Sequence, residues 1–218
     1  MTAAPRPAHA TDFTWFRRDH PDLAEAYCLT LVQGLTAEEL QRRFGAVPAG
    51  EVVGLREVTD TGPDGREEDD HPVGELPEGI DPENWSYVAV TELDGWALAV
   101  EPNGYLGVTP EAIARLAEGT RLVSHFRNIN AVDHFHWWEH GTRRLHFEPL
   151  FPTQRDGEDA EGRGTSELLT ACGFHLDDDS FDLHTEAAFA LAERLTDVRL
   201  APERLAGLTF RLGYVPGP

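Results

Sequence analysis

The chain has 218 residues, of which 40% are hydrophobic and 26% charged, so it is long and apolar enough to bury the core of a globular domain. Its 39 acidic and 18 basic residues give a formal net charge of −21. This charge argues against nucleic acids and anionic membrane surfaces as partners, because both attract cationic side chains. Every basic residue is arginine, and the absence of lysine excludes Schiff-base enzymes, lysine-containing phosphate loops and kinases of the usual kind.

The negative charge is concentrated in two segments. Residues 51–85 contain twelve acidic and two basic residues, and residues 156–182 contain nine acidic and one basic. The first segment includes a Gly-Pro-Asp-Gly turn and a run of four acidic residues, which is typical of an exposed, mobile insertion. We therefore expect a flexible N-terminus over residues 1–11 and a single domain over residues 12–218, with an acidic insertion at about 59–84.

Two cysteines bear on the cellular compartment. Cys28 and Cys172 are far apart and have no CxxC spacing, so they predict buried free thiols rather than a disulfide or a zinc site. The first ten residues lack the apolar core of a signal peptide, and no apolar run approaches the roughly 18 residues of a membrane span. We expect a cytoplasmic protein that does not enter the membrane.

Two helices are expected before the sheet. The first spans about residues 21–32, where Pro21 opens it and apolar side chains recur at helical spacing. The second begins at Thr36, because Thr36 and Glu39 form a capping box, and it ends at Gly45. A short turn joins the two helices into a helical hairpin.

The clearest strand signal is a hairpin near the middle of the chain. Residues 85–93 and 96–101 carry apolar side chains on both faces, and Asp94-Gly95 between them is typical of a type I′ turn. Because both faces are apolar, these strands are predicted to be central and covered on both sides. Residues 51–58 are expected to form a short edge strand.

The rest of the chain alternates between strands and helices. Thr109-Pro110 begins a helix that ends near Glu118. Further strands are expected at 121–128, 132–138 and 143–147, followed by helices near 165–172 and 183–195, a shorter helix after Ala201-Pro202 and a final apolar run over 208–215. This order predicts an α+β fold, in which an antiparallel β-sheet meander is flanked by N-terminal and C-terminal helices.

Several segments together resemble a known family. They are YCLTLVQGLTAEEL (27–40), GWALAVEPNGY (95–105), SHFRNINA (124–131) and FEPLFPTQRDG (147–157), followed by CGF (172–174) before an acidic turn. Over roughly residues 12–195 the chain resembles an actinobacterial domain-of-unknown-function family. The resemblance implies one cytosolic domain and assigns no catalytic residue.

Half of the ten histidines lie within residues 125–146. His134 and His136 point to one side of a predicted strand, and His146 on the next strand can face them. These imidazoles can bind zinc or another divalent metal, with Glu148 as a fourth ligand or a base. Alternatively, the cluster is only the polar outer face of a sheet, and no cofactor is present.

The register of this hairpin bears on the choice between a metal site and a polar face. A three-residue loop that ends at Gly141 places His134 opposite His146 and His136 opposite Arg144. A positive charge from Arg144 within the cluster disfavours a metal ion there. Arg144 is also a candidate binding residue.

Other polar residues are candidates for binding. Arg127, Asn128 and Asn130 lie at a predicted strand end, in a Phe-Arg-Asn-x-Asn pattern whose guanidinium group can hold a carboxylate or phosphate. Arg127 can equally pair inside the fold with Glu101 or Glu148, and these two carboxyl groups are themselves a conceivable acid pair. Trp138 falls on the polar face, where it can anchor a partner or pack against another element.

Two classes of function stay open. The first is a non-enzymatic protein-interaction module, immunity- or regulator-like, whose acidic loops speed association with a basic protein partner. The alternative is a metal-dependent hydrolase that uses His134, His136 and His146. We favour the first class, because no serine or cysteine lies in a recognisable nucleophile motif and each catalytic signal has a structural explanation.

Overall fold

The computed structural model describes residues 6–62, 78, 80–81, 84–177 and 180–217. Most of the predicted acidic insertion therefore lies outside the described residues, as does the first part of the expected flexible N-terminus.

One antiparallel sheet and the helices around it make up the described chain. The strands are β1 (Tyr27–Gln33), β2 (Val47–Val53), β3 (Trp85–Leu93), β4 (Trp96–Pro102), β5 (Arg121–Arg127), β6 (Asp133–Glu139), β7 (Thr142–Phe147), β8 (Arg155–Asp156) and β9 (Thr209–Pro216). The helices are η1 (Ala10–Asp12), α1 (Trp15–Asp19), α2 (Pro21–Glu25), α3 (Ala37–Phe44), α4 (Leu55–Thr61), η2 (Leu106–Val108), α5 (Pro110–Leu116), α6 (Arg163–Cys172), α7 (His184–Thr196) and α8 (Pro202–Gly207). In the part of the chain that the structure describes, none of these helices is long and apolar enough to cross a membrane.

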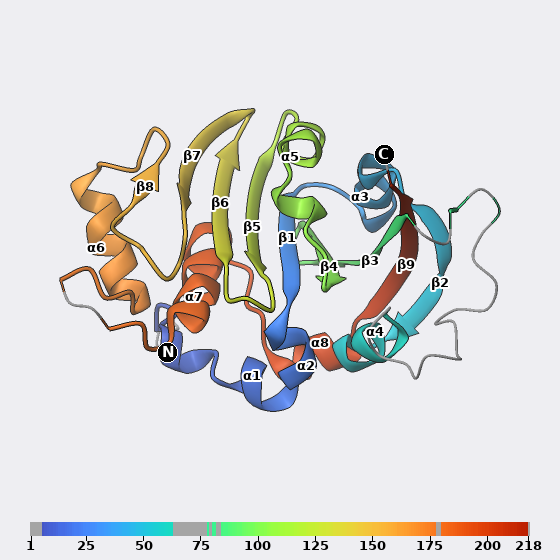
Figure 1. The fold of residues 1–218 in the computed structure, drawn as a ribbon, viewed down its shortest axis with the longest axis horizontal. Coiled ribbons are helices and arrows are strands. Elements are labelled where there is room, and N and C mark those ends of the chain that lie inside the picture. Colours follow the sequence, from blue (N-terminus) through green and yellow to red (C-terminus); the bar gives the residue numbers. More distant parts are fainter. Residues whose placement is uncertain (1–5, 63–77, 79, 82–83, 178–179, 218) are drawn as a thin grey trace, which may run out of the picture.

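The strand order is β2-β9-β3-β4-β1-β5-β6-β7-β8, and every neighbouring pair is antiparallel (Figure 1). The expected α+β fold is thus confirmed. The sheet is more than a simple meander, because two strands from distant parts of the chain are inserted into it. β1 lies between β4 and β5, and β9 lies between β2 and β3.

Helices cover the two faces of the sheet unequally. One face packs against α1, α2 and α4 and against the C-terminal helices α6, α7 and α8, and together they form the larger apolar core. The other face packs against α3 and α5, mainly over β9, β3, β4, β1 and β5. The helices that cover the second face therefore end at α5, and the next strands in the sheet, β6 and β7, lie beyond them.

The predicted central hairpin is confirmed. Asp94 and Gly95 have φ angles of 52° and 79°, as a type I′ turn requires. Leu93 and Trp96 face each other and belong to the larger core, whereas Ala97 belongs to the smaller one. The strands β5, β6 and β7 and the helices α5, α6, α7 and α8 also lie within a few residues of their predicted positions.

β1 is the main departure from the predicted elements. The expected helix over residues 21–32 ends at Glu25, and Tyr27 then begins a strand that pairs with β4 on one side and β5 on the other. A strand covered on both faces carries a continuous apolar run, in which apolar residues also recur at helical spacing. The predicted helical hairpin is therefore wrong. Its second helix is confirmed, since Thr36 Oγ1 accepts the backbone N–H of Glu39.

Two predicted boundaries also shift. The edge strand expected over residues 51–58 is β2, but it ends at Val53, because Gly54 turns the chain with a φ of 93° into α4. The ordered domain begins before residue 12. Ala8 and Ala10 are both buried in the larger core.

Candidate functional site

The ends of β5 and β6 and the start of α7 meet around Arg127. Its Nη1 atom lies 3.3 Å from Asp133 Oδ2 and 3.1 Å from His184 Nε2. The Asp133 side chain is completely buried, and that of Arg127 is only 14% exposed. Arg127 thus forms an ion pair inside the fold, but its partner is Asp133 and neither of the predicted partners, Glu101 and Glu148.

Hydrogen bonding fixes the tautomer of His184. Its Nδ1 atom donates to the carbonyl oxygen of Phe181 at 2.7 Å, so Nε2 is left to accept from Arg127. Asp133 Oδ1, the second oxygen of the buried carboxylate, has no hydrogen-bond partner among the described residues. Unsatisfied buried polar atoms are uncommon in folded proteins, and they make this cluster a functional candidate.

A second charge pair, between the buried Glu186 and the largely exposed Arg17, lies in the same layer between the sheet and its helices. Arg17 Nε, in α1, lies 3.0 Å from Glu186 Oε1 in α7. Nearby, the Tyr27 hydroxyl and His125 Nδ1 are 3.1 Å apart in the buried core. Burial lowers the pKa of His125 to about 3, although the charge of Asp133 acts in the opposite direction, so the ring is neutral at pH 7.

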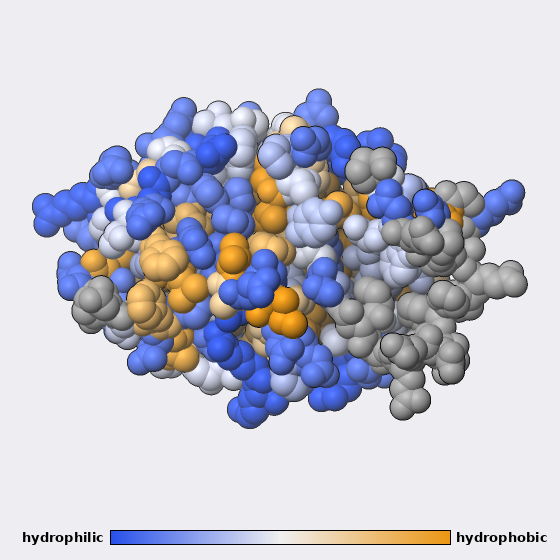
Figure 2. Space-filling model, viewed as in Figure 1, coloured by the Kyte–Doolittle hydropathy of each residue, from blue (hydrophilic) through white to orange (hydrophobic). Residues whose placement is uncertain are grey.

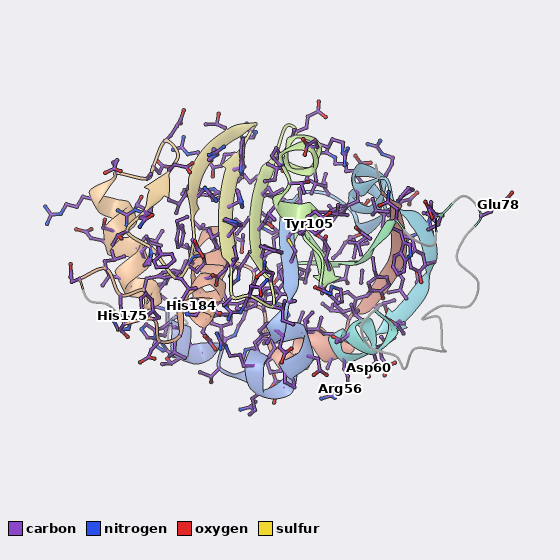
Figure 3. All side chains as sticks on the ribbon, viewed as in Figure 1. Arg56, Asp60, Glu78, Tyr105, His175 and His184 are labelled. Atoms are coloured by element: carbon purple, nitrogen blue, oxygen red, sulfur yellow. The ribbon has the colours of Figure 1, made fainter. Side chains whose placement is uncertain are left out.

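Two pockets open beside this cluster, and Ile129 lines both of them. The first, of about 350 Å³, includes the side chains of Arg17 and Arg127. The second, of about 430 Å³, carries three carboxylates, from Asp22, Glu25 and Asp60. Figure 3 shows Asp60 and Arg56 at the lower edge of the molecule, on α4. A carboxylate pocket beside an apolar side chain can accept a basic side chain, whose stem is apolar and whose tip is charged.

Exposed apolar side chains lie at the same end of the sheet as Arg127. Five of the seven large apolar side chains exposed within the described residues come from three segments at this end of the sheet: Ile129, Val132, Phe151, Phe181 and Leu183. We call these five residues the apolar rim. The ring centroids of Phe151 and Phe181 are 6.2 Å apart, and Leu183 directly precedes His184, the partner of Arg127. Figure 2 shows apolar side chains among polar ones on the left and in the centre of the face viewed.

The histidine hairpin has a different register from the predicted one. Its turn contains two residues of positive φ, His140 and Gly141, in place of a three-residue loop. A bulge in the ladder then restores the apolar side chains to the core face, so His136 faces His146 instead of Arg144. The predicted register is wrong because it did not include a bulge.

The three imidazoles nevertheless lie together. His134 Nδ1 is 3.3 Å from His146 Nε2, and the rings of His136 and His146 stack with centroids 4.3 Å apart. Asp156 Oδ2 lies 2.8 Å from His146 Nδ1. Burial lowers the pKa of His136 to about 3, and the neighbouring His146 acts in the same direction. Among the described residues, no three histidine, cysteine or acidic side chains are arranged to hold a metal ion.

The remaining binding candidates lie in separate places. Arg144 binds Asp159 at 2.7 and 2.9 Å and Glu158 at 2.7 Å, so its guanidinium group holds the segment after β8 and stays outside the histidine cluster. Trp138 is partly buried and packs against the α3–α5 core. Asn130 is exposed in the β5–β6 connection.

Glu101 has a structural role. Its two carboxylate oxygens accept the backbone N–H groups of Leu106 and Gly107 at 2.8 and 2.9 Å, which ties η2 to the sheet. Glu148 follows β7, four strands away and roughly 19 Å across the sheet, so the two carboxyl groups do not form an acid pair. Burial raises the pKa of Glu101 to about 7, although the two N–H donors act against this shift.

Sequence reasoning found Arg127 but missed most of its surroundings. His184 and Glu186 lie more than fifty residues further along the chain, and no spacing rule connects them to a strand end. One signal could have found Glu186: it is a charged residue within an apolar stretch of helix, where every residue from 185 to 192 is buried. Charged residues at such positions are almost always paired.

The fold and the site define an antiparallel α+β domain with one open sheet and a buried charge cluster at one end of its strands. The chain belongs to a family of unknown function, DUF6461, whose model matches residues 6–218. This match confirms the expected domain family of unknown function and extends it over almost the whole chain. No curated protein and no solved structure matches the chain.

Asp133→Asn tests the buried charge cluster. The substitution removes a negative charge that faces Arg127 and His184 in a completely buried site, so we expect the free energy of unfolding to fall by about 3–5 kcal/mol. Asp94→Asn is the matched control, because Asp94 pairs with Arg204 on the surface and its loss should cost less than about 1 kcal/mol. Urea denaturation measures both. Equal losses for the two variants would contradict the importance of the buried pair.

Glu101→Gln tests the protonation of the buried carboxyl group. Because its folded pKa of about 7 lies above the ordinary glutamate value of 4.5, folding favours the protonated form. The stability contributed by Glu101 is therefore complete below pH 4.5 and is lost as the pH rises to about 7, by up to about 3 kcal/mol. Glutamine does not titrate, so the difference in unfolding free energy between parent and variant should shrink over this range. A difference independent of pH would show that Glu101 stays ionised.

Proposed function

We propose that this chain is a protein-interaction module that docks its partner on the apolar rim and Arg127. One observation carries the proposal: three segments distant in sequence bring five exposed apolar side chains to one end of the sheet. Clustered exposed apolar residues are typical of interaction surfaces on soluble proteins, and aromatic and arginine side chains are the commonest energetic centres of interfaces. Asp133 and His184 hold Arg127 in place before a partner arrives, which limits the entropy lost on binding.

We propose further that the partner is basic. The pocket lined by Asp22, Glu25 and Asp60 adjoins Ile129 of the apolar rim, so a lysine or arginine side chain next to an apolar contact would fit both. The net charge of −21 favours rapid encounter with a cationic protein. Such a combination suits an immunity- or regulator-like protein.

The compartment we propose is the cytoplasm of an actinobacterial cell. The two cysteines, Cys28 and Cys172, are free and buried. Free thiols are ordinary in a reducing compartment, and their burial protects them from oxidation.

Charge substitutions in the apolar rim test the docking face. In a pull-down from an actinomycete lysate, we expect Ile129→Asp and Phe181→Asp to lower the recovery of a captured partner at least tenfold, because a carboxylate at the centre of an interface must be desolvated. Both side chains are at least half exposed, so the substitutions should leave folding intact. The measurement is partner recovery, followed by the dissociation constant for the purified pair.

Val53→Asp is the control for this experiment. Val53 is also exposed, at 59%, but it lies in the edge strand β2 at the far side of the sheet. It should retain the partner as well as the parent does. If the rim variants recover as much partner as the Val53→Asp control does, the proposed face is ruled out.

A metal-dependent hydrolase is the second candidate, and one observation favours it. His134 Nδ1 and His146 Nε2 are 3.3 Å apart, close to the separation of two nitrogen ligands on one tetrahedral zinc ion. Asp156 on the other nitrogen of His146 corresponds to the carboxylate that commonly orients a metal-binding histidine. His136 or Glu148 would have to rotate to supply a third ligand.

Metal content decides this second candidate. Elemental mass spectrometry on untagged protein purified without chelator should find about one zinc, iron or manganese ion per chain, and His134→Ala and His146→Ala should lose it while staying folded. His175→Ala, at an exposed histidine outside the cluster, is the control. Protein without metal after supplementation, or variants that retain it, would eliminate the hydrolase.

A further inference from the structure

Two pockets meet at one end of the central strands. The antiparallel register places Tyr27, at the start of β1, beside Arg127 at the end of β5 and beside Pro102 at the end of β4. The last residues of α2 therefore lie next to the residues that follow β5, and Glu25 and Ile129 line both pockets. In Figure 1 this end of β1 points to the lower edge, where α1, α2 and α4 lie. A ligand that reaches across Glu25 and Ile129 can thus occupy both pockets.

Arg127 supplies hydrogen-bond donors to the pocket of about 350 Å³. Its Nη1 atom makes both of its contacts, with Asp133 and His184. Among the described residues Nε and Nη2 have no hydrogen-bond partner, and unlike Asp133 Oδ1 they are not closed to solvent. Because the side chain is only 14% exposed and lines this pocket, these two nitrogens face it.

The same two nitrogens hold carboxylates elsewhere in this chain. Arg18 binds Asp19 through Nε and Nη2, at 2.7 Å each. Arg144 binds Asp159 through Nε and Nη2, at 2.7 and 2.9 Å. Parallel N–H groups in this arrangement match the two oxygens of a carboxylate. On Arg127 the pair is open, so the pocket is suited to a carboxylate that comes from another molecule.

Arg17 brings a second guanidinium group to this pocket. The side chain is 45% exposed, but Glu186 and Thr185 hold its Nε and Nη2 atoms at 3.0 and 2.8 Å, and Nη1 has no partner within the described part of the chain. Since both arginines of the pocket are already paired with carboxylates, they bind a ligand through fixed N–H donors more than through net charge. Glu25, on the shared wall, can accept an N–H group next to the bound carboxylate.

The second pocket indicates what is attached to this carboxylate. Beyond Glu25 it carries Asp22 and Asp60, and neither forms an ion pair with a described residue. Ile129 on the shared wall is 74% exposed. An arginine or lysine residue with a free α-carboxylate has the matching order of groups, which is an anion, an apolar stem and a cation.

We infer that the two pockets together bind the C-terminal residue of the partner, an arginine or a lysine. Its carboxylate accepts from Arg127, its amide N–H donates to Glu25, its stem lies on Ile129 and its cation lies between Asp22 and Asp60. This inference rests on the proposed function, because it uses the same acidic pocket for the basic side chain. The residues before the C-terminal one then lie on the apolar rim, to which Ile129 belongs.

The dipeptide acetyl-glycyl-arginine, with a free carboxyl group, is the probe, and the readout is the δ1-methyl resonance of Ile129. The chain has three isoleucines, so Ile129→Val identifies this resonance, and Ile113 on the other face of the sheet is an internal reference. We expect the Ile129 resonance to shift with saturation at a dissociation constant of about 1 mM, while that of Ile113 stays unchanged. The C-terminal amide loses the carboxylate and the citrulline analogue loses the positive charge, so each should bind at least fivefold more weakly.

Pro21→Glu tests the carboxylate pocket. Pro21 is an exposed residue of its wall, at the first position of α2, where an acidic side chain suits a helix. The added carboxylate repels that of the ligand, so the free acid should bind at least fivefold more weakly and the amide no more weakly than before. Thr14→Glu adds the same charge at an exposed site outside both pockets and should change neither affinity.

Asp60→Asn tests the cation pocket. It should weaken binding of the free acid at least fivefold, because it removes a carboxylate that faces the guanidinium group of the ligand. Glu57→Gln is the matched control. Glu57 is exposed on the same helix, α4, and lines neither pocket, so this variant should bind as the parent does.

Each contrary outcome overturns a stated part of the inference. Absence of a saturable Ile129 shift at about ten times the expected dissociation constant overturns the site. Equal affinities for acid and amide overturn the C-terminal assignment but leave the proposed function standing, because an internal basic residue then fills the acidic pocket. Free L-arginine that binds more tightly than the acetylated dipeptide overturns the partner in favour of an amino acid. The proposed function fails separately, if Phe181→Asp captures as much partner as Val53→Asp does, since neither residue lines these pockets.

Discussion

The insertion of β1 between β4 and β5 is the constraint on which the rest of the structure depends. The strands β2, β9, β3 and β4 form one half of the sheet and β5, β6, β7 and β8 the other, and β1 joins them through hydrogen bonds on both of its edges. A sheet divided at this point would expose two edges and both apolar cores. The site follows from the same arrangement, because Tyr27 at the start of β1 pairs with Arg127 at the end of β5.

The two faces of β1 belong to two different groups of polar side chains. On the face covered by α7, Tyr27 is in register with Arg127, the centre of the buried charge cluster. On the other face, Thr30 begins a polar row that runs across the strands through Ser124, His136 and His146. Thr30 and Ser124 hydrogen-bond each other at 2.9 Å under η2, so the buried end of the row is satisfied. Beyond the helices the row becomes the histidine cluster, where the sheet is only partly covered and the buried His136 Nδ1 has no hydrogen-bond partner among the described residues.

Local signals were enough to predict most of the elements, whereas the tertiary pairings were not predictable from them. The β3–β4 hairpin, the capped helix α3 and the order of later strands rest on turn residues, caps and alternation, which act within a few residues. β1 was predicted as a helix because its apolar run fits both periods, and only its two neighbouring strands decide between them. The bulge in β7 was not predicted for a similar reason, because the sequence does not show which residue of a strand the ladder leaves unpaired. The Arg127 cluster joins segments more than fifty residues apart, so only Arg127 itself could be singled out.

The amino-acid composition explains both why the arginines are paired inside the protein and why the docking face is negatively charged. Twelve of the seventeen arginines that the structure describes form ion pairs with carboxylates of this chain. With no lysine and with twice as many acidic as basic residues, internal pairing uses most of the cations and leaves carboxylates in excess. Arg127 is one of these paired arginines. It offers a partner a fixed side chain more than a positive charge, because Asp133 already neutralises it. The excess carboxylates, such as those of the pocket beside Ile129, therefore set the sign of the electrostatic attraction, while the apolar rim supplies the contact area.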